Sequence, residues 1–180
     1  MTCIVGFKTR DKVYIGGDTL GSGGQSGTVR KDGKVFRNKD MIFGFTSSYR
    51  MGQLLRYVFT PPAHPEGEDD MTYLVKRFVP EVIDCFSKGQ FLTKSSDAIS
   101  GGTFLFGYRG ELYKIYSDMQ VAISTLPYEA CGCGEEYAKG AMGVLVNSIH
   151  LDPEEIITKA LEITTVHSTG VGGSFEIISI

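Results

Sequence analysis

A surplus of basic residues is the first thing that this sequence lacks. Its 180 residues contain 18 lysines and arginines and 21 aspartates and glutamates, so the formal net charge is −3 at pH 7. Proteins that bind nucleic acid neutralise phosphates with clustered basic side chains, and no such stripe occurs here. The sequence therefore argues against a nucleic acid as partner.

Long hydrophobic runs are also missing. The longest apolar stretches have the length of a strand, as in MIFGF at 41–45, whereas a transmembrane helix needs about 20 apolar residues. The first residues do not combine a charged segment with an apolar one, which is the pattern of a secretory signal peptide. We therefore expect no membrane segment and a cytoplasmic location.

Cysteine is scarce, with one residue each at positions 3, 85, 131 and 133. An even number permits a disulfide framework, but a chain of this length buries enough surface to be stable without bridges. Cys131 and Cys133 are closer together than the usual zinc-binding pair, and no second pair follows. The acidic run EGEDD at 66–70 is more typical of a solvated loop than of a metal site. We expect reduced cysteines and no metal or organic cofactor.

Hydrophobic periodicity and turn residues predict an α+β fold. The composition is that of a soluble globular protein, and the absence of repeats and of a long linker predicts one domain over residues 1–180. Strands are expected at 2–9, 13–18, 34–38, 41–47, 103–108, 112–117, 120–124 and 175–180, and helices at 51–58, 71–88, 135–149 and 153–166. The stretch 19–33 is expected to be a loop with at most a short strand, and Pro80 to kink the second helix. This order predicts two antiparallel sheets stacked between helix layers.

Thr2 is the first residue with a chemical role to consider. Methionine is generally removed before a small residue, which would leave a threonine at the N-terminus. A threonine hydroxyl is a weak nucleophile that needs an adjacent base. A free α-amine has a pKa of about 7.7–8.0, so part of it is unprotonated near neutral pH. A terminal threonine thus carries nucleophile and base together, although Thr2 could equally be just the first residue of a strand.

Asp18 and Lys34 are expected near Thr2. A short loop at 10–12 pairs residues whose numbers sum to roughly 20–22, which places Asp18, Thr19 or Leu20 opposite Thr2 and so brings the Asp18 carboxylate beside the chain start. Lys34 begins the next hairpin, after the glycine-rich stretch. A lysine near the amine and hydroxyl would lower their proton affinity, and Asp18 could be its counter-charge. Taken alone, Asp18 could merely begin a turn, and Lys34 could be a solvated lysine.

These residues resemble the proteasome-type peptidases, both the proteasome β-subunits and the bacterial HslV-type peptidase that works with an ATPase. The most specific similarity lies in three N-terminal stretches, Thr2-Cys-Ile-Val-Gly, Ile15-Gly-Gly-Asp18-Thr and Gly33-Lys34-Val-Phe. Weaker similarity continues in Ile42-Phe-Gly-Phe-Thr-Ser, Cys131-Gly-Cys-Gly-Glu-Glu-Tyr-Ala, Ala160-Leu-Glu-Ile and Gly170-Val-Gly-Gly. The resemblance implies a four-layer αββα sandwich of the N-terminal nucleophile (Ntn) hydrolase type.

The resemblance also implies roles for five residues. Thr2 would be the nucleophile and its amine the base, Lys34 would tune both, and Asp18 would hold Lys34. Ser47 stands where the family usually has a glycine whose backbone N–H stabilises the oxyanion. Cys133 stands where the family has a serine near the threonine, and a thiol is a weaker donor than a hydroxyl.

Two further positions depart from the proteasome β-subunits. Those subunits carry an aspartate and a serine before the last strand, where this sequence has Ser168 and Val171. The bacterial type lacks the full set, so this departure favours the bacterial comparison.

The activity implied by the resemblance is hydrolysis of peptide bonds through an acyl-enzyme on Thr2. It further implies a homo-oligomer of stacked rings, with peptides or unfolded proteins as substrates and an ATPase ring that delivers them. Two alternatives stay open. One is an Ntn amidase that acts on a small molecule or on its own precursor. The other is a non-catalytic shell subunit, because a retained Met1 turns the α-amine into an amide.

Histidines and Cys3 are weaker candidates. His64, His150 and His167 are scattered along the sequence, and His64 lies in a proline-rich stretch. Cys3 adjoins Thr2, but side chains alternate along a strand, so Cys3 is expected on the opposite face, packed in the core.

Overall fold

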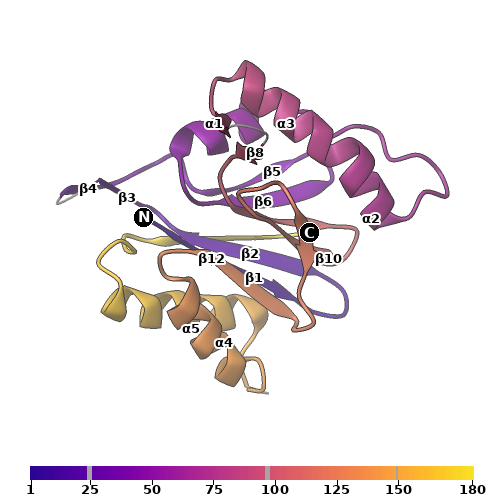
Figure 1. The fold of residues 1–180 in the computed structure, drawn as a ribbon. Coiled ribbons are helices and arrows are strands. Elements are labelled where there is room, and N and C mark those ends of the chain that lie inside the picture. The colour runs from indigo at the N-terminus through magenta and orange to yellow at the C-terminus, as the bar shows by residue number, and fades with distance from the viewer. Residues whose placement is uncertain (24–25, 96–97, 149) are drawn as a thin grey trace.

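The computed structural model describes residues 1–23, 26–95, 98–148 and 150–180. Two antiparallel sheets lie face to face between two layers of helices, as Figure 1 shows. The predicted α+β arrangement of sheets between helix layers is therefore confirmed. None of the helices in the described ranges is long and apolar enough to cross a membrane.

The first sheet contains the chain start. Its strand order is β12-β1-β2-β13, formed by Tyr128–Gly132, Cys3–Lys8, Val13–Asp18 and Phe175–Ser179. Helices α4 (Glu135–Leu145) and α5 (Pro153–His167) cover its outer face (Figure 1). Asp152 caps α5 in a capping box with Glu155, and Pro153 is the first helical residue, as the sequence predicts.

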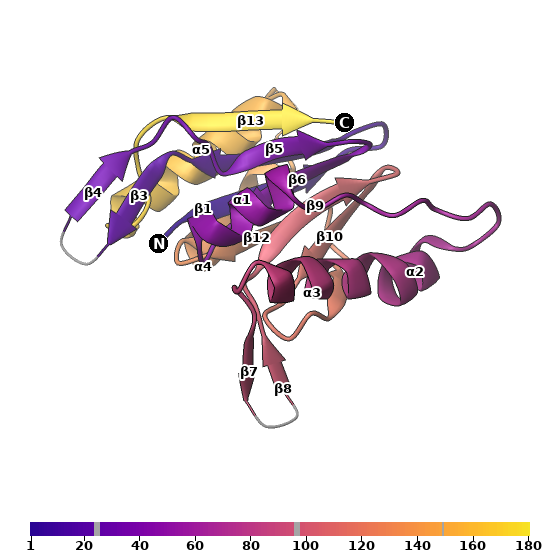
Figure 2. The same ribbon diagram turned by 90° about the horizontal axis from the view of Figure 1, so that it is seen from above.

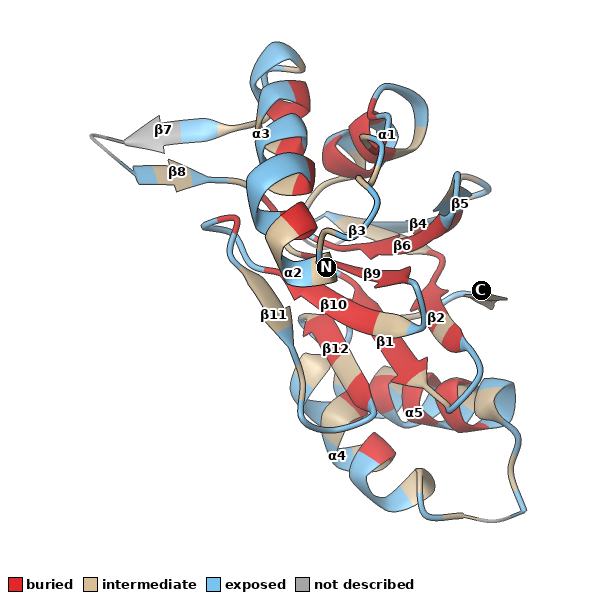
Figure 3. Ribbon diagram, turned by 90° about the vertical axis from the view of Figure 1, so that its right-hand side faces the viewer, coloured by how far each residue is buried: buried red, intermediate tan, exposed pale blue. Residues whose placement is uncertain are grey.

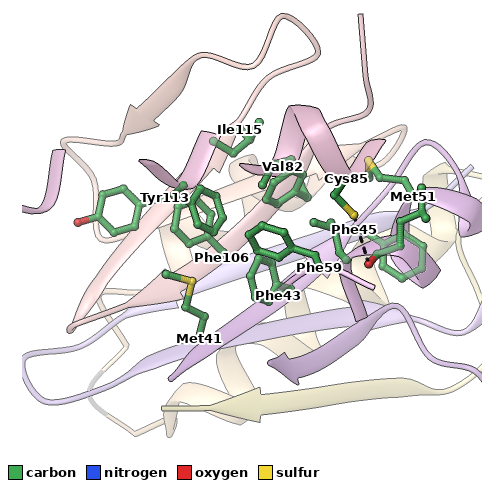
Figure 4. Packing of buried hydrophobic residues seen from close by; sticks show 14 of the residues in the cluster. Met41, Phe43, Phe45, Met51, Phe59, Val82, Cys85, Phe106, Tyr113 and Ile115 are labelled. Atoms are coloured by element: carbon green, nitrogen blue, oxygen red, sulfur yellow. Dashed lines mark hydrogen bonds between the residues drawn. The ribbon is translucent and has the colours of Figure 1, made fainter. Parts of the chain in front are cut away.

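The second sheet has the order β11-β10-β9-β6-β5. These strands are Val121–Ile123, Glu111–Ile115, Phe104–Tyr108, Met41–Phe45 and Val35–Asn38. Its outer face is covered by α1 (Tyr49–Tyr57) and by a long helical segment of three parts, α2 (Asp70–Tyr73), the π-helical turn η1 (Leu74–Phe78) and α3 (Val79–Lys88). Figure 4 shows the phenylalanine-rich core beneath these helices.

Pro80 does not break the segment into separate helices. A proline in a helix removes one backbone donor and crowds the preceding turn. Here Pro80 stands near the start of α3, and the wider η1 turn comes immediately before it. The segment is therefore continuous through Pro80, and its irregular part is a π-helical turn at Leu74–Phe78 between two α-helical parts.

Some strands were not predicted. The expected loop at 19–33 contains a hairpin of β3 (Leu20–Gly23) and β4 (Ser26–Val29). A second hairpin, β7 (Thr93–Ser95) with β8 (Ala98–Ser100), stands away from the body beyond α3 in Figures 2 and 3. Strand β12 was also not predicted. Its sequence, Tyr-Glu-Ala-Cys-Gly, has no clear alternation of polar and apolar residues, and its partner β1 lies far away in the sequence.

The hairpin of β1 and β2 fixes what surrounds the chain start. Ile4 pairs with Gly17 and Val5 with Gly16, so paired residue numbers sum to 21, as predicted. Strand β13 pairs with the other edge of β2, with Phe175 opposite Asp18. Figure 3 shows that the interior strands are buried, so the end of β2 carries Asp18 into the protein interior beside the start of β1.

Candidate active site

Asp18 binds the backbone directly after Thr2. The N–H of Cys3 donates to Asp18 Oδ1 at 3.0 Å, and Asp18 has no exposed surface. Its other oxygen, Oδ2, accepts from the N–H groups of Leu20 at 3.3 Å and Gly172 at 3.2 Å. Together with the Cys3 N–H, these donors hold the Asp18 carboxylate in place. The aspartate therefore ties the start of β1 to the end of β2 and to the segment before β13.

Lys34 completes a buried ion pair with Asp18. Its Nζ lies 2.8 Å from Asp18 Oδ1 and donates to the carbonyl of Leu20 at 2.7 Å. The Lys34 side chain is 1% exposed. Burial lowers the pKa of Lys34, because a charged amine loses its hydration, and the negative charge of Asp18 opposes that shift. Since one Asp18 oxygen binds both Lys34 Nζ and the Cys3 N–H, the ammonium is held next to the chain start.

Thr2 is 5% exposed, and its hydroxyl is engaged by Met1. Thr2 Oγ1 donates to the Met1 carbonyl at 2.6 Å, while Met1 itself is 54% exposed. In this form the nitrogen of Thr2 is an amide and has no basic lone pair. Removal of Met1 would free the hydroxyl and create the terminal amine at the same time.

Ser47 has the backbone conformation for which glycine is best suited. Its φ is 66°, in the left-handed region that side chains rarely adopt. Its Oγ accepts from the Thr103 N–H at 3.2 Å. Among the described residues, the backbone N–H of Ser47 donates no hydrogen bond. An N–H left free in a fixed turn is the type of donor that can stabilise an oxyanion.

Cys133 reaches the backbone of Thr2. Its exposed thiol lies 3.5 Å from the Thr2 carbonyl oxygen and 3.5 Å from Ser168 Oγ. Gly132, just before it, has φ 105°, and a β-carbon added there would lie 2.2 Å from the Thr2 carbonyl oxygen. Glycine is therefore required for β12 to approach the chain start this closely.

Ser168 is a neighbour that the sequence did not place at this site. In the sequence, Ser168 is notable only because the proteasome β-subunits have a different residue there. In the structure, its hydroxyl lies within hydrogen-bonding distance of the Cys133 thiol. Val171, the other departure, is 4% exposed and packs in the core beneath α4 and α5. One of the two positions thus borders the site, and the other serves packing.

The side chains of Cys3, His64 and His167, the weaker candidates from the sequence, make contacts that serve packing and not the site at Thr2. Cys3 is buried beneath α4 and α5, as predicted, and burial raises the pKa of its thiol to about 12. His64 bonds to the Tyr108 hydroxyl at 2.9 Å and to the Glu68 carbonyl at 2.7 Å. His167 stacks on Tyr137. All four cysteines are free, and the described residues contain no group of three or more potential metal ligands.

A hollow of about 80 Å³ opens beside Thr2. Its lining consists of Met1, Thr2, Ser22, Phe45, Ser47, Ser48 and Tyr49. Ser22, Phe45 and Tyr49 were not identified from the sequence. They come from β3, β6 and α1, and only the tertiary fold brings them together, so no local pattern could have found them.

Comparison with protein-family models gives no match, and comparison with curated proteins gives none either. Solved structures do match. BPH from Thiobacillus denitrificans has a TM-score of 0.84 and 18% identity, over 99% of this chain and 97% of that chain. HslV from Trypanosoma brucei has a TM-score of 0.69 and 18% identity, over 99% of this chain and 98% of that chain.

A third match is Anbu from Yersinia bercovieri, with a TM-score of 0.65 and 14% identity over 99% of this chain and 81% of that chain. A further structure of the Thiobacillus protein is a complex with epoxomicin. These proteins are HslV-type or otherwise proteasome-like. The matches establish for this chain the proteasome-like αββα fold that the N-terminal stretches led us to expect.

Proposed function

We propose that this chain, which shares the fold of the HslV-type proteasome-like peptidases, is a threonine endopeptidase whose nucleophile is Thr2 after removal of Met1. The observation that supports this most strongly is the buried Asp18–Lys34 pair, because one carboxylate oxygen binds both Lys34 Nζ and the N–H next to Thr2. A buried cation held beside a chain end has an electrostatic purpose there that packing alone does not require.

In the proposed reaction the free amine of Thr2 takes the proton of the Thr2 hydroxyl. The hydroxyl oxygen then attacks the carbonyl carbon of a peptide bond, and the N–H of Ser47 stabilises the resulting oxyanion. Collapse of this intermediate breaks the C–N bond, and the departing amine receives the proton. A water molecule, activated by the same amine, hydrolyses the ester and restores Thr2.

Lys34 acts on this reaction through its charge. A positive charge near the terminal amine and the hydroxyl lowers the pKa of both groups, so that more amine is free to act as base near neutral pH. Asp18 keeps Lys34 in position, and three backbone N–H groups hold the Asp18 carboxylate. Cys133, through the Thr2 carbonyl, helps to fix the position of the chain end.

The chain that retains Met1 is the inactive form in this proposal. There the Thr2 nitrogen is an amide, and the hydroxyl donates to the Met1 carbonyl. The second candidate function depends on the same residue: if Met1 is never removed, the protein is a non-catalytic subunit of a proteasome-like shell.

Assembly into rings is part of the proposal. Four large hydrophobic side chains are exposed on α4 and α5, namely Tyr137, Val144, Ile163 and Val166. Contiguous exposed apolar groups mark contacts between proteins, and we propose that these four side chains contribute to the contacts of a homo-oligomer that encloses the active sites. Unfolded protein delivered by an ATPase ring is the proposed substrate, and the four free cysteines support a reducing compartment such as the cytoplasm.

A peptide epoxyketone tests the proposal, because this group reacts with a terminal hydroxyl and with its own free amine. Epoxomicin, which is bound in a structure of the Thiobacillus protein, is the first compound to use. We expect intact-mass and peptide mapping to show one adduct, at Thr2, in the mature chain and none in Thr2→Ala. Thr2→Ser should keep part of the labelling. Labelling of Thr2→Ala to the same extent would reject Thr2 as the nucleophile.

A further inference from the structure

Two hydroxyl groups near Thr2 are buried and lack partners. Ser22 Oγ and Tyr49 Oη have no hydrogen-bond partner among the residues that the structure describes. Both residues line the hollow beside Thr2. An unpaired buried hydroxyl costs about 1–3 kcal/mol, so such groups are usually satisfied by a protein group, a water or a ligand. Two unpaired hydroxyl groups in residues beside the nucleophile indicate a place where a substrate forms hydrogen bonds.

The Tyr49 ring is fixed from two sides. The Arg30 guanidinium lies 3.6 Å from the centre of the ring, and Arg30 is itself held by Asp32 at 2.8 Å. The Phe45 ring meets the Tyr49 ring edge-on at 5.6 Å. Burial raises the pKa of Tyr49 to about 12, so the phenol stays neutral and can both donate and accept. The Tyr49 ring is therefore held in place beside the hollow.

Phe45 limits the depth of the hollow. Its ring is 4% exposed and rests on the backbone of Gly52, where an added β-carbon would lie 2.2 Å from the ring. The ring therefore cannot sink further toward α1. The ring closes the hollow on this side, and three of the remaining lining residues, Ser22, Ser48 and Tyr49, carry hydroxyl groups.

A second hollow continues from the first. Its volume is about 420 Å³, and its lining is Gly21, Ser22, Thr28, Arg30 and Tyr49. Ser22 and Tyr49 line both hollows, so these two residues lie between them. The Arg30 charge is neutralised by Asp32, so the junction offers hydrogen bonds without a net attraction for an anion. Met1 lines only the first hollow, which its removal would enlarge.

We propose that Ser22 and Tyr49 select a substrate residue with an uncharged carboxamide side chain, above all asparagine, at the carbonyl that Thr2 attacks. This inference rests on the proposed peptidase function. A carboxamide offers both a donor and an acceptor, so it can pair with the two hydroxyls at once. An apolar side chain of the same size would leave both hydroxyls unpaired, and a site built for hydrogen bonding rejects such an analogue.

Two fluorogenic peptides that differ only in asparagine or leucine before the reporter group test the selection. We expect the mature protein to show a kcat/KM roughly tenfold higher for the asparagine peptide, the effect of about one or two neutral hydrogen bonds. Tyr49→Phe keeps the ring and its contacts with Arg30 and Phe45 but removes the hydroxyl, so the ratio should fall toward one. Tyr57→Phe, the same change at a residue of α1 that is 73% exposed, is the matched control and should leave the ratio unchanged.

Equal rates for the two peptides in the wild-type protein would overturn the proposal, and so would a preference that survives Tyr49→Phe. Ser22→Ala provides a second variant if Tyr49→Phe does not fold, as judged by circular dichroism, and it should reduce the ratio as well. The affinity of both peptides for mature Thr2→Ala separates selection from catalysis. If the wild type has no turnover and no epoxyketone adduct, the peptidase function fails, while equal affinities in Thr2→Ala would reject the selection by itself.

Discussion

Lys34 is a charged side chain with almost no solvent around it, and its only carboxylate partner among the described residues is Asp18. Removing one partner of a buried ion pair destabilises the protein by more than the pair itself contributes to stability. The reason is that the other charge stays buried without a counter-charge. A lysine that only tuned the reaction through its charge would affect rate and not folding. The 1% exposure of Lys34 changes that expectation, because its removal also leaves Asp18 in the interior with only its backbone donors.

Lys34→Met should therefore lower both the melting temperature and the turnover. The expected losses are about 3–5 kcal/mol in the free energy of unfolding and roughly a hundred- to a thousandfold in rate. Adding Asp18→Asn removes the unpaired charge, so the double variant should recover stability but not activity. Thermal unfolding and peptide turnover of the wild type, the single variant and the double variant would be compared. Wild-type turnover in the double variant would contradict an electrostatic role for Lys34.

Ser47 yields a prediction from backbone conformation. Its φ of 66° suits glycine better than serine, so Ser47→Gly should keep the turn and retain or increase turnover. Ser47→Val places a β-branched side chain in a conformation that it strongly disfavours and should lower kcat. If Ser47→Val matched the wild type in steady-state kinetics, the turn would not position the oxyanion donor.

At the scale of elements, the sequence predicted well the features that depend on residues close together in the chain, such as hairpin register and helix ends. The β1–β2 hairpin has a short loop, so counting gives its register to within one residue; the observed register places Asp18 opposite Cys3, directly after Thr2. The N-terminus of α5 follows from Asp152 and Pro153. The pairing of β12 with β1 joins residues more than a hundred positions apart, and no local pattern encodes it. The same holds for the meeting of Ser22 with Tyr49, which two separate hairpins and a helix produce.

The approach of β12 to Thr2 can be tested with two glycines. Gly132 and Gly110 both have positive φ, so replacing either by alanine costs about 1–2 kcal/mol of backbone strain. Only at Gly132 would the new β-carbon meet the Thr2 carbonyl; at Gly110 no atom lies within 4 Å. Gly132→Ala should thus abolish turnover, whereas Gly110→Ala should lose only stability. Chemical denaturation and turnover of both variants decide the matter, and an active Gly132→Ala would show that β12 does not position Thr2.

At the scale of the whole molecule, the sequence predicted the layers of sheets and helices but not the two small hairpins outside them. Alternating strand blocks and helix pairs were sufficient to predict two sheets between helices, and the solved structures share that arrangement. The β3–β4 and β7–β8 hairpins were not predicted, because their short polar strands lack the hydrophobic alternation of a buried strand.

Assembly is the prediction that belongs to this scale. The exposed hydrophobic side chains on α4 and α5 favour association, so native mass spectrometry at micromolar concentration should show a closed ring-based oligomer. Val144→Lys, at a residue that is 77% exposed, should weaken the assembly without unfolding the protomer. A strict monomer would remove the enclosed chamber from the account and leave the hydrolase chemistry untouched.

The most direct test of the central claim compares two forms of the protein that differ only in Met1. One form begins at Thr2, released from a cleavable fusion, and the other retains Met1, so that the Thr2 nitrogen is an amide and its hydroxyl binds the Met1 carbonyl. Turnover of the same peptide substrate would be measured for both forms at equal concentration, after intact-mass analysis of each. The account predicts turnover by the form that begins at Thr2 and none by the form that keeps Met1. Equal turnover by the two forms would contradict it, since no terminal amine would then be needed as the base.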